Sequence, residues 1–596
     1  MMFQGLKTFL WKKKYLFLFV SLFLVVTTQR FLSERQNGLV NSVSSDGLGY
    51  YCYLPAAIIY QDFTYSYYDV KENYIKPFYK PYISPYKDKG VNKYYSGTAF
   101  CMLPFFLLGI LISAIAGTDI NGYTDTFLML ISIASLVYFL LAVKLLTKVA
   151  KHFLISEKTT MLVCFMVFLS TNLFHYTIQE PSMSHVYSFF AVSLFLYCFV
   201  RLLTDITTKR LVMLGLALAL VILIRPVNVV VVLFTPFFFE NFKSYLLFLK
   251  QIIIKHFFGT LLFLLMPVLG VVIQFTFYYL QTGDFFVMTY EGETFDFKNP
   301  EIMNVLFSYR KGIFIYAPLL FLMVLFILLS TRFWFKRIIF FITMFVFIYI
   351  TSSWWCWWYG GGLSIRPAID FYPIIIITVL FLLNYIQPKT KKVLLALSIP
   401  FVFFGQLIAF QYSNLLIDTV LMDKQKFWDV FLKTDLATIN EDRLKSILEN
   451  RKIFKMELMT YEQDDDASKI VDGGFKSKKA CKVGKDNWYS KGFGFPIKDL
   501  GFSGSFYIVV ECMAKTDADG RDLGLVVSID ANNEMVSWNV VFRNQFSAGD
   551  DGWAKMTQIV EVLESQNNDS NYLKVFANTE KGYNLVDDLK YTIIKK

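Results

Sequence analysis

The chain alternates long apolar runs with short polar segments from Tyr15 to Phe410 and then changes character. Several of the apolar runs reach about 18 residues, which is the length that a helix needs to cross the ~30 Å hydrocarbon core of a bilayer. The pattern therefore predicts an α-helical polytopic membrane protein with about eleven spans.

The expected spans are Tyr15–Val26, Phe127–Val143, Thr160–Thr177, Val186–Leu203, Leu211–Ile224, Val227–Phe239, Phe257–Leu280, Ile313–Ser330, Ile338–Ser352, Ile369–Tyr385 and Val393–Phe410.

Basic side chains gather in the short segments between the apolar runs. From Lys144 onward, successive Lys and Arg clusters are separated by two apolar runs. Alternate loops on the cytoplasmic side of a membrane show this spacing. The same rule places the N-terminus, with Lys12–Lys14, in the cytoplasm. The first apolar run is expected to be an uncleaved anchor, because no small-residue cleavage site follows it. An odd number of spans leaves the C-terminus outside.

One apolar run breaks this alternation. Counting Phe100–Ala116 as a crossing would place the cluster at Lys144 outside, against the charge rule. The run contains Pro104 and follows a long, Tyr-rich polar stretch. We therefore expect a re-entrant or interfacial helix within a large first external loop, residues 30–123.

Beyond the last apolar run, the chain resembles a soluble domain. Residues 412–470 are charged and helix-like, and from residue 471 short alternating strands are separated by Gly, Asp and Asn turns. We expect a transmembrane domain (1–411), a helical linker (412–470) and an extracytoplasmic all-β sandwich of jelly-roll type (471–596). Cys481 and Cys512 are able to pair in an exported domain, although the absence of disulfides is the simpler expectation.

Composition narrows the function classes. Hydrophobic residues make up 55% of the chain, against about 45–50% in soluble proteins. The net charge of +11 lies mostly in the loop clusters, so no nucleic-acid partner is expected. The sequence has no P-loop, no Gly-x-Gly-x-x-Gly motif after a strand and no His-Glu-x-x-His motif. These absences argue against a primary pump and against an enzyme that uses nucleotide sugars.

The first candidate catalytic residue is Asp46, in SSDGLGYYCYLPA just beyond the first span. An acidic side chain between glycines and aromatic residues near the membrane surface is suited to act as a general base. A turn aspartate before an interfacial helix explains the same pattern, because Asp-Gly is a common turn.

A second candidate lies in the short outward loop QEPSMSHVY, which carries Glu180 and His185. A carboxylate and an imidazole five residues apart can ligate a divalent metal ion or orient a base. A hydrated loop with a helix cap at Ser184 is the alternative.

Three cations fall on the predicted outer side, against the charge rule: Lys93, Arg225 and Arg366. Arginine binds phosphate in a bidentate manner, so the set indicates a phosphate site. Long basic side chains that anchor helix ends at the interface are the alternative.

Aromatic residues accompany these charges. Trp357 and Trp358, in WWCWWYGGG, are suited to stack on sugar rings, or to form an interfacial belt. Tyr290 and Glu291 lie in the loop GDFFVMTYEGETFDF, which is either a lid with acceptor contacts or a simple acidic surface loop. Two further residues are expected to contact the sugar or acceptor, Tyr50 and Asp370.

Taken in order, these segments resemble the GT-C superfamily of membrane glycosyltransferases, close in layout to protein O-mannosyltransferases and bacterial aminoarabinose transferases. Asp46 matches an acidic residue of the first external loop, and Glu180 matches a second acidic residue in the next outward loop. Lys93, in NKYYSGTAFCMLPFF, stands in the Lys place of a Lys-Pro-Pro-Leu-like segment, without its double proline. The family usually has Asp where this chain has Glu180 with His185, which leaves a metal requirement open. The resemblance covers residues 1 to about 410, and the tail, closing in NLVDDLKYTII, resembles carbohydrate-binding jelly rolls.

The resemblance implies inverting transfer of a sugar from an undecaprenyl- or dolichyl-phosphate-linked donor to a glycan, lipid or protein acceptor on the extracytoplasmic side. The alternative is a flippase or transporter of lipid-linked sugars, although no internal repeat typical of transporters is visible. A bacterial inner membrane is the expected location. The implied roles are general base (Asp46), lipid-phosphate binding (Lys93, Arg225, Arg366), and a divalent metal site or fixed geometry (Glu180, His185).

Overall fold

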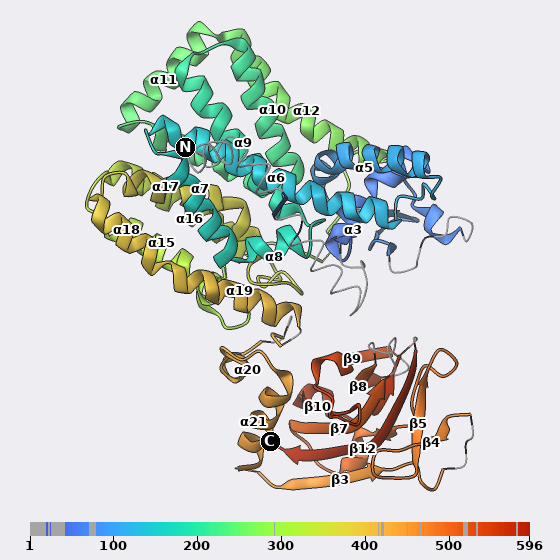
Figure 1. Ribbon diagram of the computed structural model, residues 1–596. Helices are drawn as coiled ribbons and strands as arrows, with labels where there is room; N and C mark the ends of the chain where they lie inside the picture. Colours follow the sequence, from blue (N-terminus) through green and yellow to red (C-terminus); the bar gives the residue numbers. More distant parts are fainter. Residues whose placement is uncertain are drawn as a thin grey trace, which may run out of the picture. The chain divides into compact units, whose positions relative to one another are not determined.

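The computed structural model describes residues 42–596 together with Val20, Ser21 and Leu24, apart from residues 71–74, 76–78, 291, 415, 419–421, 450, 465, 467, 517–522, 532–533 and 580–581. Most of the first predicted span, Tyr15–Val26, and the candidate Glu291 lie outside the described residues. The chain divides into two units (Figure 1). The helical unit includes Leu39–Ser413 and Asp418–Lys424, and the second unit includes Gln425–Lys596.

The helical unit consists of α-helices, short 3-10 helices and one small hairpin. Its elements are α3 (Asp46–Tyr51), α4 (Tyr53–Ile58), η2 (Ser66–Asp69), β1 (Ser84–Tyr86), β2 (Lys89–Val91), α5 (Gly97–Ala116), α6 (Asp125–His152), α7 (Glu157–Ser170), α8 (Asn172–Ile178), α9 (Ser184–Thr204), α10 (Thr208–Ile224), η5 (Pro226–Phe238), α11 (Phe242–Lys255), α12 (Phe257–Thr282), α13 (Ile302–Phe307), α14 (Ile313–Tyr316), α15 (Pro318–Leu329), α16 (Trp334–Ser352), η6 (Arg366–Phe371), α17 (Tyr372–Leu383), α18 (Pro388–Leu397) and α19 (Ile399–Ser413).

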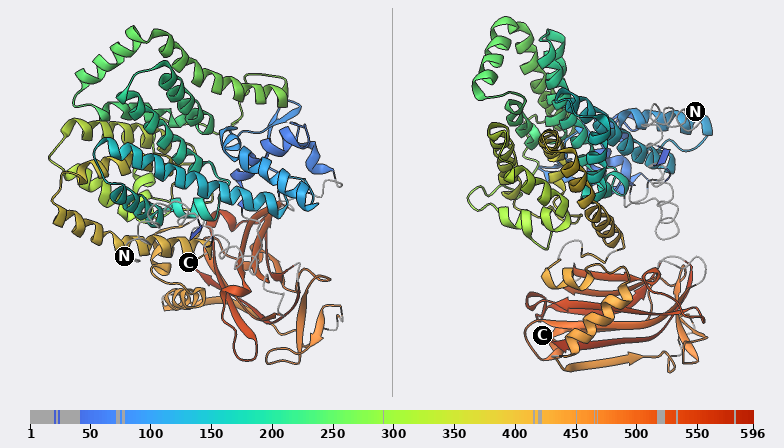
Figure 2. Two further views of the ribbon diagram at one scale, coloured as in Figure 1. Left: turned by 45° about the horizontal axis from the view of Figure 1, so that its top comes forward. Right: turned by 60° about the vertical axis from the view of Figure 1, so that its left-hand side comes forward.

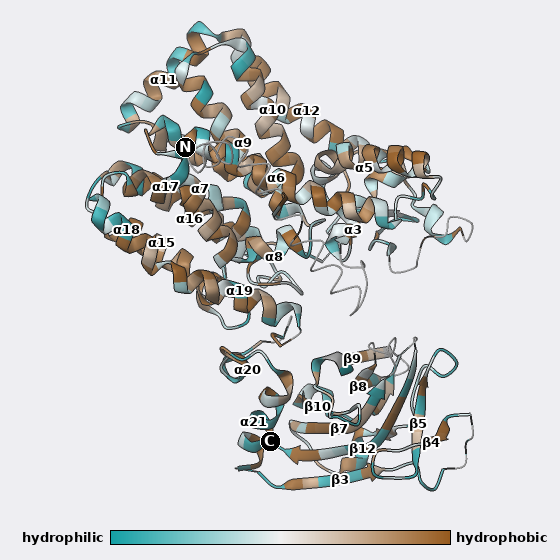
Figure 3. Ribbon diagram, viewed as in Figure 1, coloured by the Kyte–Doolittle hydropathy of each residue, from teal (hydrophilic) through white to brown (hydrophobic). Residues whose placement is uncertain are grey.

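Within the described residues, seven helices are long and apolar enough to cross a membrane, or nine if two bent pairs each count as one span. The bent pairs are α7 with α8, at 83°, and η5 with α11, at 109°. The expected span Ile313–Ser330 is divided at Ala317 into α14 and α15. Apolar residues dominate these helices, whereas α11 and α18 carry hydrophilic positions (Figure 3). The protein is an integral membrane protein, and the count of eleven spans stays a prediction.

Helix α5 forms the apolar run that breaks the charge alternation. It forms one unbroken helix of 20 residues with a mean hydropathy of 2.5, despite Pro104 in its interior. The helix has no break, and its length is sufficient to cross a bilayer. The prediction that it does not cross stays a prediction. A position at the membrane interface stays a prediction.

Small residues allow the helices to pack closely. A Cβ on Gly215 of α10 would lie 2.7 Å from the carbonyl oxygen of Phe263 in α12, and one on Gly97 of α5 would lie 2.4 Å from backbone atoms of α10. Close backbone approach of this kind is typical of helix contacts in membranes. The views in Figure 2 show α10 and α12 running beside each other.

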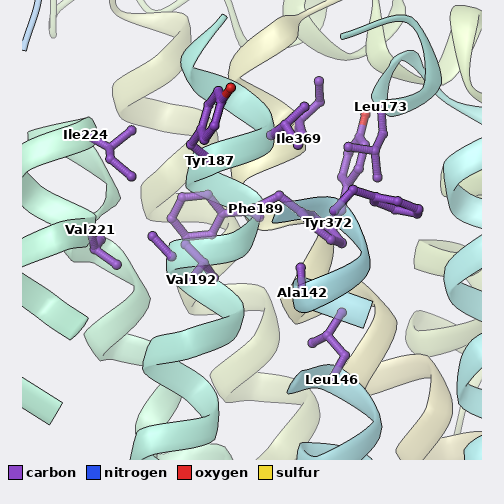
Figure 4. Close-up of a cluster of buried hydrophobic side chains, with 14 of the residues drawn as sticks. Ala142, Leu146, Leu173, Tyr187, Phe189, Val192, Val221, Ile224, Ile369 and Tyr372 are labelled. Atoms are coloured by element: carbon purple, nitrogen blue, oxygen red, sulfur yellow. The ribbon is translucent and has the colours of Figure 1, made fainter. Parts of the chain in front are cut away.

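The centre of the helical unit is a continuous apolar core. Figure 4 shows part of it, where the labelled side chains come from α6, α8, α9, α10, η6 and α17. Phe189 and Val192 of α9 are fully buried, as is Ile369 of η6. The close-up labels Ala142, Leu146, Leu173, Tyr187, Phe189, Val192, Val221, Ile224, Ile369 and Tyr372.

The second unit is a β-sandwich, as predicted. A six-stranded sheet has the order β10-β7-β12-β5-β4, with β3 also paired to β12, and a four-stranded sheet has the order β6-β11-β8-β9. All pairings are antiparallel. The strands are β3 (Ile453–Met459), β4 (Ile470–Asp472), β5 (Lys479–Gly484), β6 (Phe493–Pro496), β7 (Phe506–Thr516), β8 (Gly524–Ala531), β9 (Glu534–Phe542), β10 (Trp553–Val562), β11 (Asn571–Asn578) and β12 (Tyr583–Lys595).

The predicted helical linker belongs partly to this sandwich. Residues 412–470 contain two helices, α20 (Lys424–Val430) and α21 (Leu436–Glu449), but also strand β3, which pairs with β12. Ile447 of α21 is buried against Val509 and Ile559 of the six-stranded sheet. The segment is therefore structural and not only a connection. All seven cysteines lie in the described residues and are free, with Cys481 and Cys512 buried separately.

Candidate functional site

A cavity of about 500 Å³ opens in the helical unit, lined by the ends of several elements. It collects residues that are far apart in the sequence, such as Asp46 and Arg366, which are 320 positions apart. Six of the sequence-predicted site residues line it: Asp46, Tyr50, Lys93, Arg225, Tyr290 and Arg366.

Asp46 is the first residue of α3 and is held by two donors. Its Oδ1 accepts a hydrogen bond from the Tyr94 hydroxyl at 2.7 Å, and its Oδ2 accepts one from Arg366. Burial raises the pKa of Asp46, but the Arg366 guanidinium and the neighbouring donors lower it by a larger amount together, so the net shift is downward. Asp46 is therefore an ionised carboxylate at neutral pH, and a weak base while Arg366 remains paired with it.

The glycines after Asp46 allow α3 to approach its neighbours. A Cβ on Gly47 would lie 2.0 Å from the Ser182 hydroxyl oxygen, and one on Gly49 would lie 1.9 Å from the Tyr94 ring. The Asp-Gly pair thus begins a helix and does not form an isolated turn. The two glycines of DGLG are needed because α3 packs closely against Ser182 and against Tyr94, which donates to the Asp46 carboxylate.

Replacing Gly49 by Ala is expected to destabilise the protein by about 1–3 kcal/mol, because the added methyl group overlaps the Tyr94 ring. Displacing that ring also breaks the hydrogen bond to Asp46, so activity should fall together with the thermal midpoint. Gly361→Ala is the matched control, because a Cβ there meets no atom within 4 Å. Equal midpoints for the two variants would contradict the packing argument.

Lys93 forms a second charged pair in the cavity. Its Nζ donates to Glu293 Oε1 at 2.6 Å, and the two side chains are 14% and 25% exposed. Three tyrosine rings surround the ammonium group at 5.3–5.8 Å from their centroids, those of Tyr82, Tyr94 and Tyr290. Lys93 is therefore a positioned cation and not an anchor extended into solvent. Glu293 is a site residue that the sequence did not single out from its acidic loop.

Arg225 belongs to a third pair, which is more deeply buried. Its Nε contacts Asp370 Oδ2 at 3.2 Å, while His185 Nδ1 and Asn228 Nδ2 bond the same carboxylate at 3.0 and 2.9 Å. Asp370 is fully buried. Asp370, expected to contact the sugar or acceptor, does not line the cavity and instead pairs with Arg225 from behind the cavity wall. His185, expected to bind a metal ion or orient a base, orients the Asp370 carboxylate.

Glu180 has a different partner, His175, whose Nε2 lies 3.1 Å from Glu180 Oε1. Burial raises the pKa of Glu180, but His175 and the more distant Arg366 together lower it by a larger amount, so the net shift is downward. The structure therefore engages Glu180 and His185 in separate hydrogen bonds. Across the described part of the chain, no group of three or more His, Cys, Asp or Glu side chains is arranged to hold a metal ion. This donor set does not fit the expected divalent metal site.

The loop before Arg366 is held by several polar contacts. The ammonium of Lys311 donates to the Gly362 carbonyl, and the Tyr176 hydroxyl accepts from the Leu363 N–H at 3.1 Å. Burial lowers the pKa of Lys311 to about 7. Gly362 has φ +149°, and a Cβ there would lie 2.6 Å from the Tyr176 oxygen. Lys311, which no motif indicated, therefore helps to fix the position of Arg366.

The tryptophan cluster divides between two positions. Trp354 and Trp355 line the cavity. Trp357 and Trp358, the predicted sugar platform, instead contact the Arg310 guanidinium at 5.9 and 3.7 Å from their ring centroids. The neighbouring pair is therefore the one placed to meet a ligand.

Fold and cavity define a polytopic membrane protein with a charged ligand site and a separate β-sandwich. No family model and no curated protein matches the chain. Among solved structures, arabinosyltransferase EmbB from Mycobacterium smegmatis is similar over 78% of this chain, with 10% identity and a TM-score of 0.25. The chain covers only 57% of that protein.

The CBM22-1 xylan-binding domain of Xyn10C from Paenibacillus barcinonensis is similar over 24% of this chain and 97% of that domain, with 13% identity and a TM-score of 0.17. At these TM-scores, the function must be inferred from the cavity itself.

Proposed function

We propose that the protein is a membrane glycosyltransferase of GT-C type, which transfers a sugar from a polyprenyl-phosphate-linked donor to an acceptor hydroxyl. The observation that supports this most is one cavity, set among apolar helices, that holds two carboxylates beside three cations. A lipid-linked donor needs this combination, because its chain requires an apolar groove and its phosphate requires positive charge.

In this mechanism Asp46 is the general base. The acceptor hydroxyl gives its proton to Asp46 as its oxygen attacks the anomeric carbon, and the bond from that carbon to the phosphate oxygen breaks. The polyprenyl phosphate leaves with the electron pair, and the anomeric configuration inverts in one displacement. Arg366, Lys93 and Arg225 stabilise the charge that develops on the leaving phosphate.

Other residues of the cavity are suited to hold the sugar. Tyr50, Tyr290 and Trp354 provide ring faces and edges along its wall. Asn228 is 1% exposed, and its Oδ1 has no hydrogen-bond partner among the described residues. That oxygen is suited to accept a hydrogen bond from a sugar hydroxyl.

We place this reaction on the extracytoplasmic side of a bacterial inner membrane. The basic clusters from Lys144 to Lys392 fit cytoplasmic loops, whereas the cavity residues fall in the segments that alternate with them. Nucleotide sugars are absent from that side, which favours a lipid carrier as the donor.

The test is transfer of labelled sugar by the purified full-length chain in nanodiscs, with synthetic polyprenyl-phosphate sugars as donors. Release of polyprenyl phosphate together with a glycosylated acceptor of inverted configuration is expected. Movement of intact donor across a sealed vesicle membrane, without bond cleavage, would identify a flippase instead.

We propose a glycan-binding role for the sandwich. A groove of about 510 Å³ lies on the outward face of the four-stranded sheet. Trp538 is 43% exposed in it, and Lys574 pairs with Asp530 at 2.6 Å. Exposed aromatic faces next to paired charges and hydroxyl groups suit a polar ring ligand. A glycan acceptor is the ligand class that fits both units.

Replacing Trp538 by Ala in the full-length chain is expected to weaken oligosaccharide binding by about tenfold or more, because the ring face is lost. Binding is measured on an array of soluble glycans. Trp488→Ala is the control, because Trp488 is 49% exposed in the same unit but does not line the groove. Equal losses in both variants would remove the groove from glycan binding.

A further inference from the structure

The three cations of the cavity are each paired with a carboxylate. Arg366 pairs with Asp46, Lys93 with Glu293, and Arg225 with the buried Asp370. The three pairs together carry three positive and three negative charges. The resting site is therefore nearly neutral, although a phosphate needs its positive charges uncompensated.

The pairs differ in whether a ligand can reach them. Asp46 and Glu293 line the cavity, with side chains 26% and 25% exposed. Asp370 is fully buried and holds two further hydrogen bonds, from His185 and Asn228. An entering anion can therefore displace the first two carboxylates, whereas the third remains in place.

Lys93 does not depend on Glu293 for its position. The neighbouring Asn92 donates from its backbone to Gln281 at 2.7 Å and from its side chain to the Gly49 carbonyl at 2.7 Å. Three tyrosine rings also surround the Lys93 ammonium. Glu293 thus acts as a counter-ion and is not needed as a scaffold.

We propose that Glu293 is a displaceable counter-ion of the phosphate site, and that a phosphodiester entering the cavity releases Glu293 from Lys93 and Asp46 from Arg366 together. This inference rests on the proposed function. It makes the base dependent on the donor, because Asp46 loses its cationic partner only when the phosphate takes that partner. No bond is formed or broken in this exchange. Donor binding therefore precedes activation of the acceptor.

The test is the affinity of the full-length chain in nanodiscs for undecaprenyl phosphate. Glu293→Gln removes the competing charge, so the dissociation constant is expected to fall by about tenfold. The affinity for inorganic phosphate should rise by a similar factor from a weaker starting value, because the same competing charge is removed and only the apolar contacts of the polyprenyl chain are missing. Asp284→Asn is the control: it removes a carboxylate from an exposed pair with Lys87 and should change nothing. Unchanged or weaker binding by Glu293→Gln, with a normal thermal midpoint, would overturn the proposal.

A second variant keeps the two proposals separate. Asp46→Asn should also bind undecaprenyl phosphate more tightly, because Arg366 loses its competitor. If both variants bind more tightly but no donor is ever turned over, the counter-ion inference stands and the glycosyltransferase is rejected. If wild type transfers sugar but neither variant gains affinity, only the counter-ion inference is rejected.

Discussion

Replacing Asp46 by Asn should lower sugar transfer by about 10²–10⁴-fold, the usual contribution of a general base. The amide has nearly the shape of the carboxylate and can still accept from the Tyr94 hydroxyl. It is unable to accept a proton at neutral pH. The loss should therefore fall on turnover, measured with labelled donor under single-turnover conditions, while undecaprenyl phosphate still binds.

The matched control for this variant is Asp69→Asn. Asp69 precedes α5, as Asp46 does, and pairs with Lys80, but its side chain is 68% exposed and outside the cavity. Exposed pairs of this kind contribute little to stability, so near-normal transfer is expected. If Asp46→Asn retained normal transfer, Asp46 would not be the base and the mechanism would need another proton acceptor.

Replacing Asp370 by Ala is expected to have the largest effect on stability, about 3–5 kcal/mol, because removing one partner leaves the other charge buried and uncompensated. Arg225 loses its counter-ion, and the hydrogen bonds from His185 and Asn228 are lost together. The thermal midpoint of the purified protein in detergent should fall markedly. Phosphate binding should weaken as well, since Arg225 is no longer fixed.

Asp370→Asn separates charge from hydrogen bonding, because the amide oxygen still accepts from neighbouring donors. Its midpoint should lie between those of wild type and Asp370→Ala. A wild-type midpoint for Asp370→Ala would show that the buried network is not structural. In that case the expectation of Asp370 as a sugar contact would return.

Much of the site was predictable because charge at membrane depth is costly and therefore informative. Asp46, Lys93 and Arg366 were identified by their position on the predicted outer side, and the structure brings all three to one cavity. The β-sandwich was predictable for a similar reason, since strand alternation leaves a strong local pattern.

Other features depended on contacts that no local pattern encodes. Glu293 was one of several acidic residues in its loop, and its pairing with Lys93 joins positions 200 apart. Asp370 was expected to contact the sugar or acceptor, but its side chain is 0% exposed, and burial by distant segments leaves no local mark in the sequence. Strand β3 was assigned to a linker because its partner β12 lies more than a hundred residues later. Long-range pairings of this kind are set by tertiary packing and not by spacing.

Helix η5 has a consequence for how far a short segment reaches. A 3-10 helix rises about 2.0 Å per residue, so its 13 residues extend about 26 Å, where an α-helix of equal length would extend only about 20 Å. Lys336 donates to the carbonyls of Phe237 and Phe239 at its far end, at 2.6 and 2.8 Å, and Arg225 precedes its first residue. This stretched segment therefore separates Arg225 from the backbone carbonyls that Lys336 binds by more than an α-helix of equal length would.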